Sequence, residues 1–167
     1  MGFTLGPYNP AHTLTIDPTL TWNTFLGGNG SDDGYAIAVD GSGNVYVGGT
    51  SDANWGSAVT GYTGNYDAFA AKLASDGSLT WNAFLGGSGS EHGFDIAVDG
   101  GGNVYVAGES RSKEGWARRG CRSGWEPFEE KIASDGSLTW NTFLGGGSSD
   151  YGYAIAVDSS GNVYVGG

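Results

Sequence analysis

The chain has 167 residues, of which 38% are hydrophobic and 13% aromatic, a composition too apolar for a disordered protein and suited to about one globular unit. Its net charge of −11 excludes binding to nucleic acid through a basic surface, and no apolar run approaches the length of a membrane span. The 33 glycines predict many tight turns, and the lone Cys121 excludes an internal disulfide or a cysteine-based metal cluster.

The sequence repeats with a constant period. Nearly the same octapeptide, TWNTFLGG or TWNAFLGG, begins at Thr21, Thr80 and Thr139, so the copies are 59 residues apart. A period of this length built from short strands is typical of a repeat architecture. Residues 1–16 precede the first copy and are predicted to form an N-terminal arm. They have neither the basic start nor the apolar stretch of a signal peptide.

Each period is predicted to contain four strands. In the first complete copy these strands are 35–40, 44–48, 67–73 and 79–85. The segments DGSGN (40–44) and SDGS (75–78) are short hairpin connections, in which glycine supplies the positive φ that such turns require. Because residues 36–39 (AIAV) are apolar without alternation, both sides of the first strand are expected to be buried.

Four antiparallel strands, repeated without a helical pattern, are typical of a β-propeller blade, whereas stacking into a solenoid is the alternative. The predicted fold class is therefore all-β, with about three blades per chain. Within the repeat region (17–167) the predicted units are a fourth strand 20–26, a blade 33–86, a blade 92–145 and a half blade 151–167.

Three blades do not close a ring, since propellers typically have about four to eight. Residues 11–17 are predicted to supply a third-type strand that joins residues 162–167 of another copy. Two chains paired head to tail in this way would form a six-bladed homodimer. The alternative is that the chain is a fragment of a longer propeller, with exposed strand edges that aggregate.

Two strings point to a known family: SDxGYAIAVDxSGNVYVGG, from Ser31 and again from Ser149, and DAFAAKLASDGSLTWNAFLGG from Asp67. They resemble the bacterial β-propeller repeat called the SBBP repeat, over nearly all of residues 17–167. The resemblance implies a propeller, an extracellular or cell-surface location and no catalytic residues.

Topology predicts where a ligand would bind. The long loops between second and third strands share one end of the blades with the connections between blades, and we call this end the long-loop face. Loops on a rigid scaffold are where binding residues concentrate. The candidate ligand-binding residues there are Asp32, Asp33, Trp55, Tyr62, Glu91, His92, Asp150 and Tyr151.

Each candidate also has a structural interpretation. The triplets 31–33, 90–92 and 149–151 have the composition of turns and caps, and Trp22, Trp81 and Trp140 that of blade packing. The spacing of Asp40, Ser42 and Asn44 is similar to a calcium loop but lacks its later ligands. No metal, cofactor or catalytic residue is predicted.

Residues 109–130 depart from the repeat, matching residues 50–71 at only 5 of 22 positions, and carry five of the seven lysines and arginines. The segment was either specialised for binding or altered by drift or a local frameshift. The sequence as a whole predicts a non-enzymatic, self-assembling scaffold. A carbohydrate-binding or cation-binding module on the long-loop face is the alternative, and a hydrolase using Asp32, Glu91 or Asp150 the second alternative.

Overall fold

A computed structural model of the chain describes residues 20–111, 124–146 and 149–167. The described residues form ten strands: β1 (Asp32–Val39), β2 (Val45–Ser51), β3 (Asp67–Leu73), β4 (Leu79–Leu85), β5 (Glu91–Val98), β6 (Val104–Ser110), β7 (Glu126–Ile132), β8 (Leu138–Phe143), β9 (Ala154–Val157) and β10 (Val163–Gly166). They contain no helix, hence none that crosses a membrane. The predicted all-β class is confirmed.

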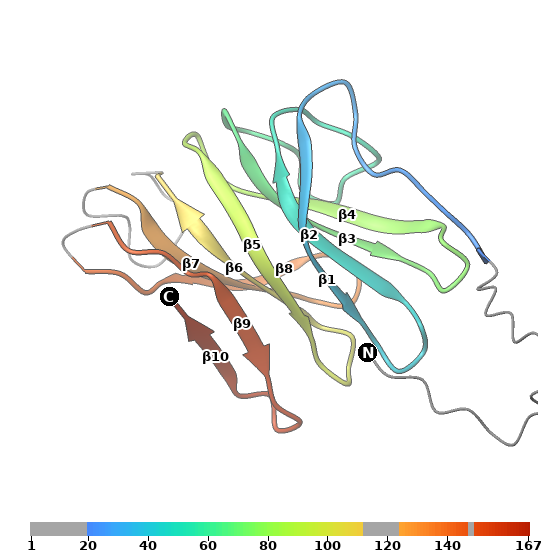
Figure 1. Cartoon of the computed structure of the whole chain (residues 1–167). Coiled ribbons are helices and arrows are strands. Elements are labelled where there is room, and N and C mark those ends of the chain that lie inside the picture. The colour runs from blue at the N-terminus through green and yellow to red at the C-terminus, as the bar shows by residue number, and fades with distance from the viewer. Residues whose placement is uncertain (1–19, 112–123, 147–148) are drawn as a thin grey trace, which may run out of the picture.

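Strands β1 to β4 form one antiparallel sheet in chain order and β5 to β8 a second, while β9 and β10 form an antiparallel pair. Figure 1 shows these three units side by side, with β5 between β1 and β9. We call them blade 1, blade 2 and the half blade. The predicted four-stranded meander is thus confirmed, and the described units do not close into a ring.

Strands β3 and β4 have the predicted bounds, whereas β1 and β2 are longer than expected. β1 begins at Asp32, which pairs with Ser51 at the end of β2. A register shift between Gly34 and Ala36 leaves Tyr35 without a partner across the ladder. The aspartates and Gly34 are poor strand formers, so local propensity indicated a later start. Pairing with β2 decides the bounds instead.

The strand predicted at residues 20–26 is not formed. A fourth strand needs a third strand beside it, and no described strand pairs with this segment. Trp22 nevertheless donates a hydrogen bond from Nε1 to the carbonyl of Ser75, at 3.0 Å. The predicted arm (1–16), the candidate strand at 11–17 and Cys121 lie outside the described residues.

The hairpins close as predicted. Gly43 and Gly77 have φ values of 80° and 85°, the left-handed region that side chains disfavour. In the first turn Asp40 accepts hydrogen bonds from the backbone of Ser42 and Asn44, at 2.9 and 3.0 Å. The DGSGN segment is therefore a turn held by its own aspartate.

The core lies in the seams between successive units. In the seam between blades 1 and 2, Ile96 of β5 packs on Gly48 of β2, where a Cβ would lie 3.3 Å from the Cβ of Ile96. Ile155 of β9 packs against Ala107 of β6 in the next seam. Blade 2 and the half blade thus each bury the isoleucine of their first strand against the second strand of the preceding unit.

The predicted two-sided burial of residues 36–39 is wrong for blade 1. Ile37 is 69% exposed and Val39 59% exposed, because no described unit precedes blade 1 on that side. Ile96, at the position equivalent to Ile37, is only 5% exposed. A repeat pattern predicts the burial of a position only where the neighbouring blade is present.

Candidate functional site

The three carboxylates at equivalent positions of the long-loop face hold the connections between units. Asp32, Glu91 and Asp150 accept hydrogen bonds from the backbone nitrogens four residues earlier, at 2.8, 2.9 and 2.9 Å. Ser51 and Ser110 donate further bonds to Asp32 and Glu91, at 2.6 and 2.8 Å. These carboxylates act as turn caps, as the structural interpretation predicted.

Glu91 is fully buried, and so is the nearby Asp67 at the start of β3. Burial raises the pKa of both groups, and the bonds from Gly87 and Ser110 to Glu91 partly offset that rise. Asp67 in turn accepts hydrogen bonds from the backbone of Thr63 and Gly64, at 2.8 and 3.1 Å. A ligand at the surface does not reach either carboxylate.

Trp55 lies in the core instead of presenting its ring to solvent. It is 5% exposed and packs edge to face on Phe69 and Phe84, with ring centroids 5.2 and 5.7 Å away. Tyr62 packs edge to face on Phe84 and donates its hydroxyl hydrogen to the Asn65 carbonyl, at 2.9 Å. The sequence placed Trp55 on a loop but gave no sign that the loop folds its ring into the blade.

Asp33, His92 and Tyr151 occupy one repeat position and remain accessible to different degrees. Asp33 is exposed, Tyr151 is 38% exposed and His92 is half-buried. Burial lowers the pKa of His92 and so favours the neutral imidazole. The centroid of the His92 ring lies 5.6 Å from that of the Tyr66 ring and 5.4 Å from that of the Trp125 ring.

Sequence reasoning missed a row of aromatic rings beside these residues. Tyr35, Phe94 and Tyr153 are again 59 residues apart, and neighbouring ring centroids in this row are 6.2 and 5.7 Å apart. Tyr66 and Trp125 form a second equivalent pair. We call these five rings, together with His92, the aromatic patch. The 59-residue period was the signal that could have found it.

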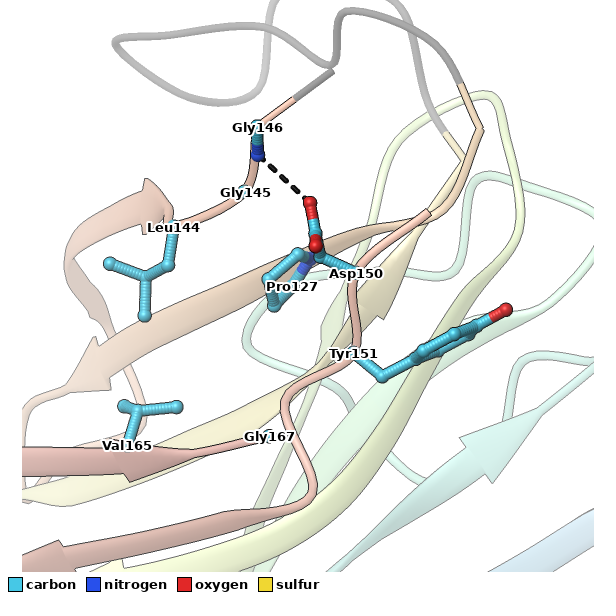
Figure 2. A pocket seen from close by; sticks show the side chains of 8 residues that line it. All are labelled: Pro127, Leu144, Gly145, Gly146, Asp150, Tyr151, Val165 and Gly167. Carbon is cyan, nitrogen blue, oxygen red and sulfur yellow. Dashed lines mark hydrogen bonds between the residues drawn. The ribbon is translucent and has the colours of Figure 1, made fainter. Parts of the chain in front are cut away.

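One pocket among the described residues is an open hollow of about 470 Å³ at the half blade. Figure 2 shows Leu144 and Val165 on one side of it and the Asp150 carboxylate bonded to Gly146, while the ring of Tyr151 points away from Leu144 and Val165. The hollow lies beside the outer edge of the half blade. Its lining comes from blade 2, through Pro127 and Leu144, and from the half blade, through Val165.

The described residues hold no group of three or more histidine, cysteine or acidic side chains placed to bind a metal. The turn carboxylates accept hydrogen bonds from residues of their own hairpins. Asp40 accepts bonds from the Asn44 side chain and the Tyr46 hydroxyl, at 2.8 and 3.0 Å, and the Asn44 side chain is the main cause that lowers the pKa of Asp40 to about 2. Asp99 and Asp158 repeat this arrangement.

The divergent segment places carboxyl groups inside blade 2. Glu129 and Glu130 of β7 are 8% and 0% exposed and stand where blade 1 has Ala70 and Ala71. One oxygen of each makes no hydrogen bond within the described residues. Burial raises the pKa of Glu130 to about 8, although Asn141 donates to it at 3.4 Å. β7 forms despite the energetic cost of burying these carboxyl groups.

Of the five clustered basic residues only Arg111 is described, with its guanidinium 5.7 Å from the centroid of the Trp125 ring.

Comparison with known families agrees with the repeat. The family model described as a beta-propeller repeat, SBBP, matches residues 21–54 and 139–167. These ranges contain the first and third copies, and so the predicted resemblance is confirmed there. A search of curated proteins returned no match.

Proposed function

We propose that this chain, which carries two SBBP β-propeller repeats, is a non-enzymatic scaffold that assembles by joining its half blade to the N-terminal segment of a second copy. The observation that carries the proposal is the position of Trp22. Its Nε1 bonds to Ser75 at 3.0 Å, just as Trp81 bonds to Ser134 at 3.0 Å in the seam between blades 1 and 2. Residues 20–26 thus stand where the fourth strand of a preceding blade would stand.

The two ends of the described chain would supply different strands of one blade. The half blade supplies first-strand and second-strand elements, β9 and β10, and the outer edge of β10 has no partner among the described strands. The segment around Trp22 supplies a fourth-strand position with no described neighbour. Unpaired strand edges favour pairing with another chain. One half from each copy would complete a blade, and two copies would provide six.

Exposed apolar side chains lie where the completed blade would pack. Ile37 would pack on Gly166 of the second copy, as Ile96 packs on Gly48 within the chain. Trp140 is 37% exposed, whereas the equivalent Trp81 is 6% exposed. Contact with a following blade accounts for that difference.

The test is the mass of the chain in solution, measured by light scattering over a range of concentrations. The proposal expects a species of about 34 kDa, twice the 17.1 kDa chain. Trp140→Ala should weaken the dimer about tenfold or more, because aromatic anchors dominate such interfaces. Leu138→Ala is the matched control, since Leu138 and Leu79 are equally exposed (44% and 41%) and Leu138 is thus outside the seam.

A wild-type mass of 17.1 kDa at every concentration, or a polydisperse aggregate, would overturn the proposal in favour of a fragment of a longer propeller. Equal weakening by Leu138→Ala would show non-specific association. No observation favours the hydrolase, because Asp32, Glu91 and Asp150 are engaged as caps. The extracellular or cell-surface location stays a prediction from the resemblance.

A further inference from the structure

The aromatic patch runs across all three units at one end of their first strands. Neighbouring rings at equivalent positions are about 6 Å apart, as the pairs Tyr35 with Phe94 and Phe94 with Tyr153 show. Blades of a propeller diverge outward, so equivalent side chains touch only near the axis. The patch therefore lines the inner, axial side of the long-loop face.

Two of the three rings in the row lie at bulges. Register shifts beside Tyr35 in β1 and Phe94 in β5 leave each of these residues without a partner across the ladder. β-Bulges redirect a side chain out of the regular pleat, and they concentrate next to functional sites. At these positions the rings of neighbouring units contact one another, whereas Ile96 packs in the seam.

Contacts among the described residues leave three of these rings accessible. Tyr35 and Tyr153 are 55% and 58% exposed, and Tyr66 is 39% exposed. Their three hydroxyls make no hydrogen bond within the described part of the chain. A contiguous exposed apolar patch with polar rims marks an interaction surface more often than it marks packing.

We propose that the aromatic patch binds a neutral oligosaccharide. Sugar rings combine an apolar face with a rim of hydroxyls, and tyrosine and tryptophan offer the complementary apolar ring with a polar edge. His92 lies beside the Tyr66 ring, and Asp33 is close enough to Tyr35 to act on it electrostatically, so both add polar groups at the rim of the patch. The net charge of −11 disfavours a polyanion.

This proposal does not rest on assembly of the ring, because every residue of the patch belongs to one chain. It also differs from the sequence prediction, which relied on Trp55 and Glu91. Both of those side chains are buried here.

The experiment is titration calorimetry of the full chain with cellohexaose, chitohexaose, xylohexaose and maltohexaose, followed by variants. Binding of at least one probe is expected, and Tyr153→Ala and Tyr35→Ala should each weaken it about tenfold, the effect of losing a stacking ring. Tyr164→Ala is the matched control, because Tyr164 has the same exposed fraction as Tyr153 (58%) but lies on β10 outside the patch. It should leave the affinity unchanged.

Three results would overturn the proposal: no heat of binding with any of the four probes, equal affinity of the Tyr153→Ala and wild-type chains, or equal weakening by Tyr164→Ala. Tetramethylammonium is titrated in parallel, since aromatic cages also bind quaternary cations. Binding of that ion without any sugar would assign the patch to a cation instead. Circular dichroism of each variant separates lost binding from lost fold.

Discussion

Ile37 and Ile96 occupy the same position of successive blades, in the strings YAIAV and FDIAV, yet 69% of Ile37 is exposed and only 5% of Ile96. The difference does not come from the strands, which have the same length and the same bulge. It comes from what precedes each blade: β2 covers Ile96, and no described strand covers Ile37. In a repeat protein, the contribution of a residue to stability depends on whether a neighbouring unit packs against it.

The largest expected effect tests directly whether Ile96 and Ile37 contribute differently to stability. Ile96→Ala should lower the free energy of unfolding by about 3 kcal/mol, because it removes a buried side chain and leaves a cavity. Ile37→Ala should change it by less than about 0.5 kcal/mol at concentrations where the chain is monomeric. Urea denaturation of both variants measures the two values. Equal losses would mean that Ile37 is covered within the single chain.

The second prediction concerns a difference between the interiors of the two blades: Glu130 of blade 2 stands where blade 1 has Ala71. Burial raises the pKa of Glu130 from 4.5 to about 8, so the folded state keeps a proton that the unfolded state releases. The free energy of unfolding should therefore fall as the pH rises from 4.5 to 8, with Glu130 contributing on the order of 4 kcal/mol to the fall.

Glu130→Gln removes this ionisation while keeping the shape. The variant should be as stable as the wild type near pH 4 and more stable by up to that amount at pH 8, measured by urea denaturation at several pH values. Asp33→Asn, at an exposed carboxylate, is the control for a general effect of removing a carboxylate. Parallel pH curves for Glu130→Gln and wild type would contradict the raised pKa of the buried Glu130 carboxyl.

The smallest expected effect concerns a feature that both blades share. Hydrogen bonds, chiefly from the Asn44 side chain, lower the pKa of Asp40 from 3.8 to about 2. The stabilisation that they provide is complete well above pH 3.8 and is lost as the pH falls through about 2. Asp40→Ala should cost about 1 kcal/mol at pH 7 and much less at pH 2, as thermal or urea unfolding would show. The same cost at both pH values would contradict a role for the ionised form.

Much of the fold could be predicted because its signals are local. The bounds of β3 and β4 follow from apolar patterns between glycine turns, and Gly43 and Gly77 supply the positive φ of the hairpins. The bulge at Tyr35 could not be predicted in this way. It depends on how β1 pairs with β2, and pairing is not visible in the residues of either strand alone.

The candidate site was predicted less well, for a related reason. The interpretation of Asp32, Glu91 and Asp150 as turn caps is confirmed, but the sequence assigned Trp55 to the surface, whereas the ring packs on Phe69 and Phe84. It also passed over Tyr35 and Tyr153, which read as ordinary strand residues. Whether an aromatic side chain is buried depends on contacts with other strands and loops, which the chemistry of the residue does not reveal.

The sequence by itself determined the 59-residue period, the four-stranded blade and its turns, because each depends on residues close together in the chain. Only the tertiary structure decided which equivalent positions differ. It buried Ile96 and left Ile37 exposed, placed Glu130 in the core, and brought Tyr35, Phe94 and Tyr153 together. The physical reason is that burial and ring contacts arise between blades, from residues one period apart, so no single copy of the repeat contains them.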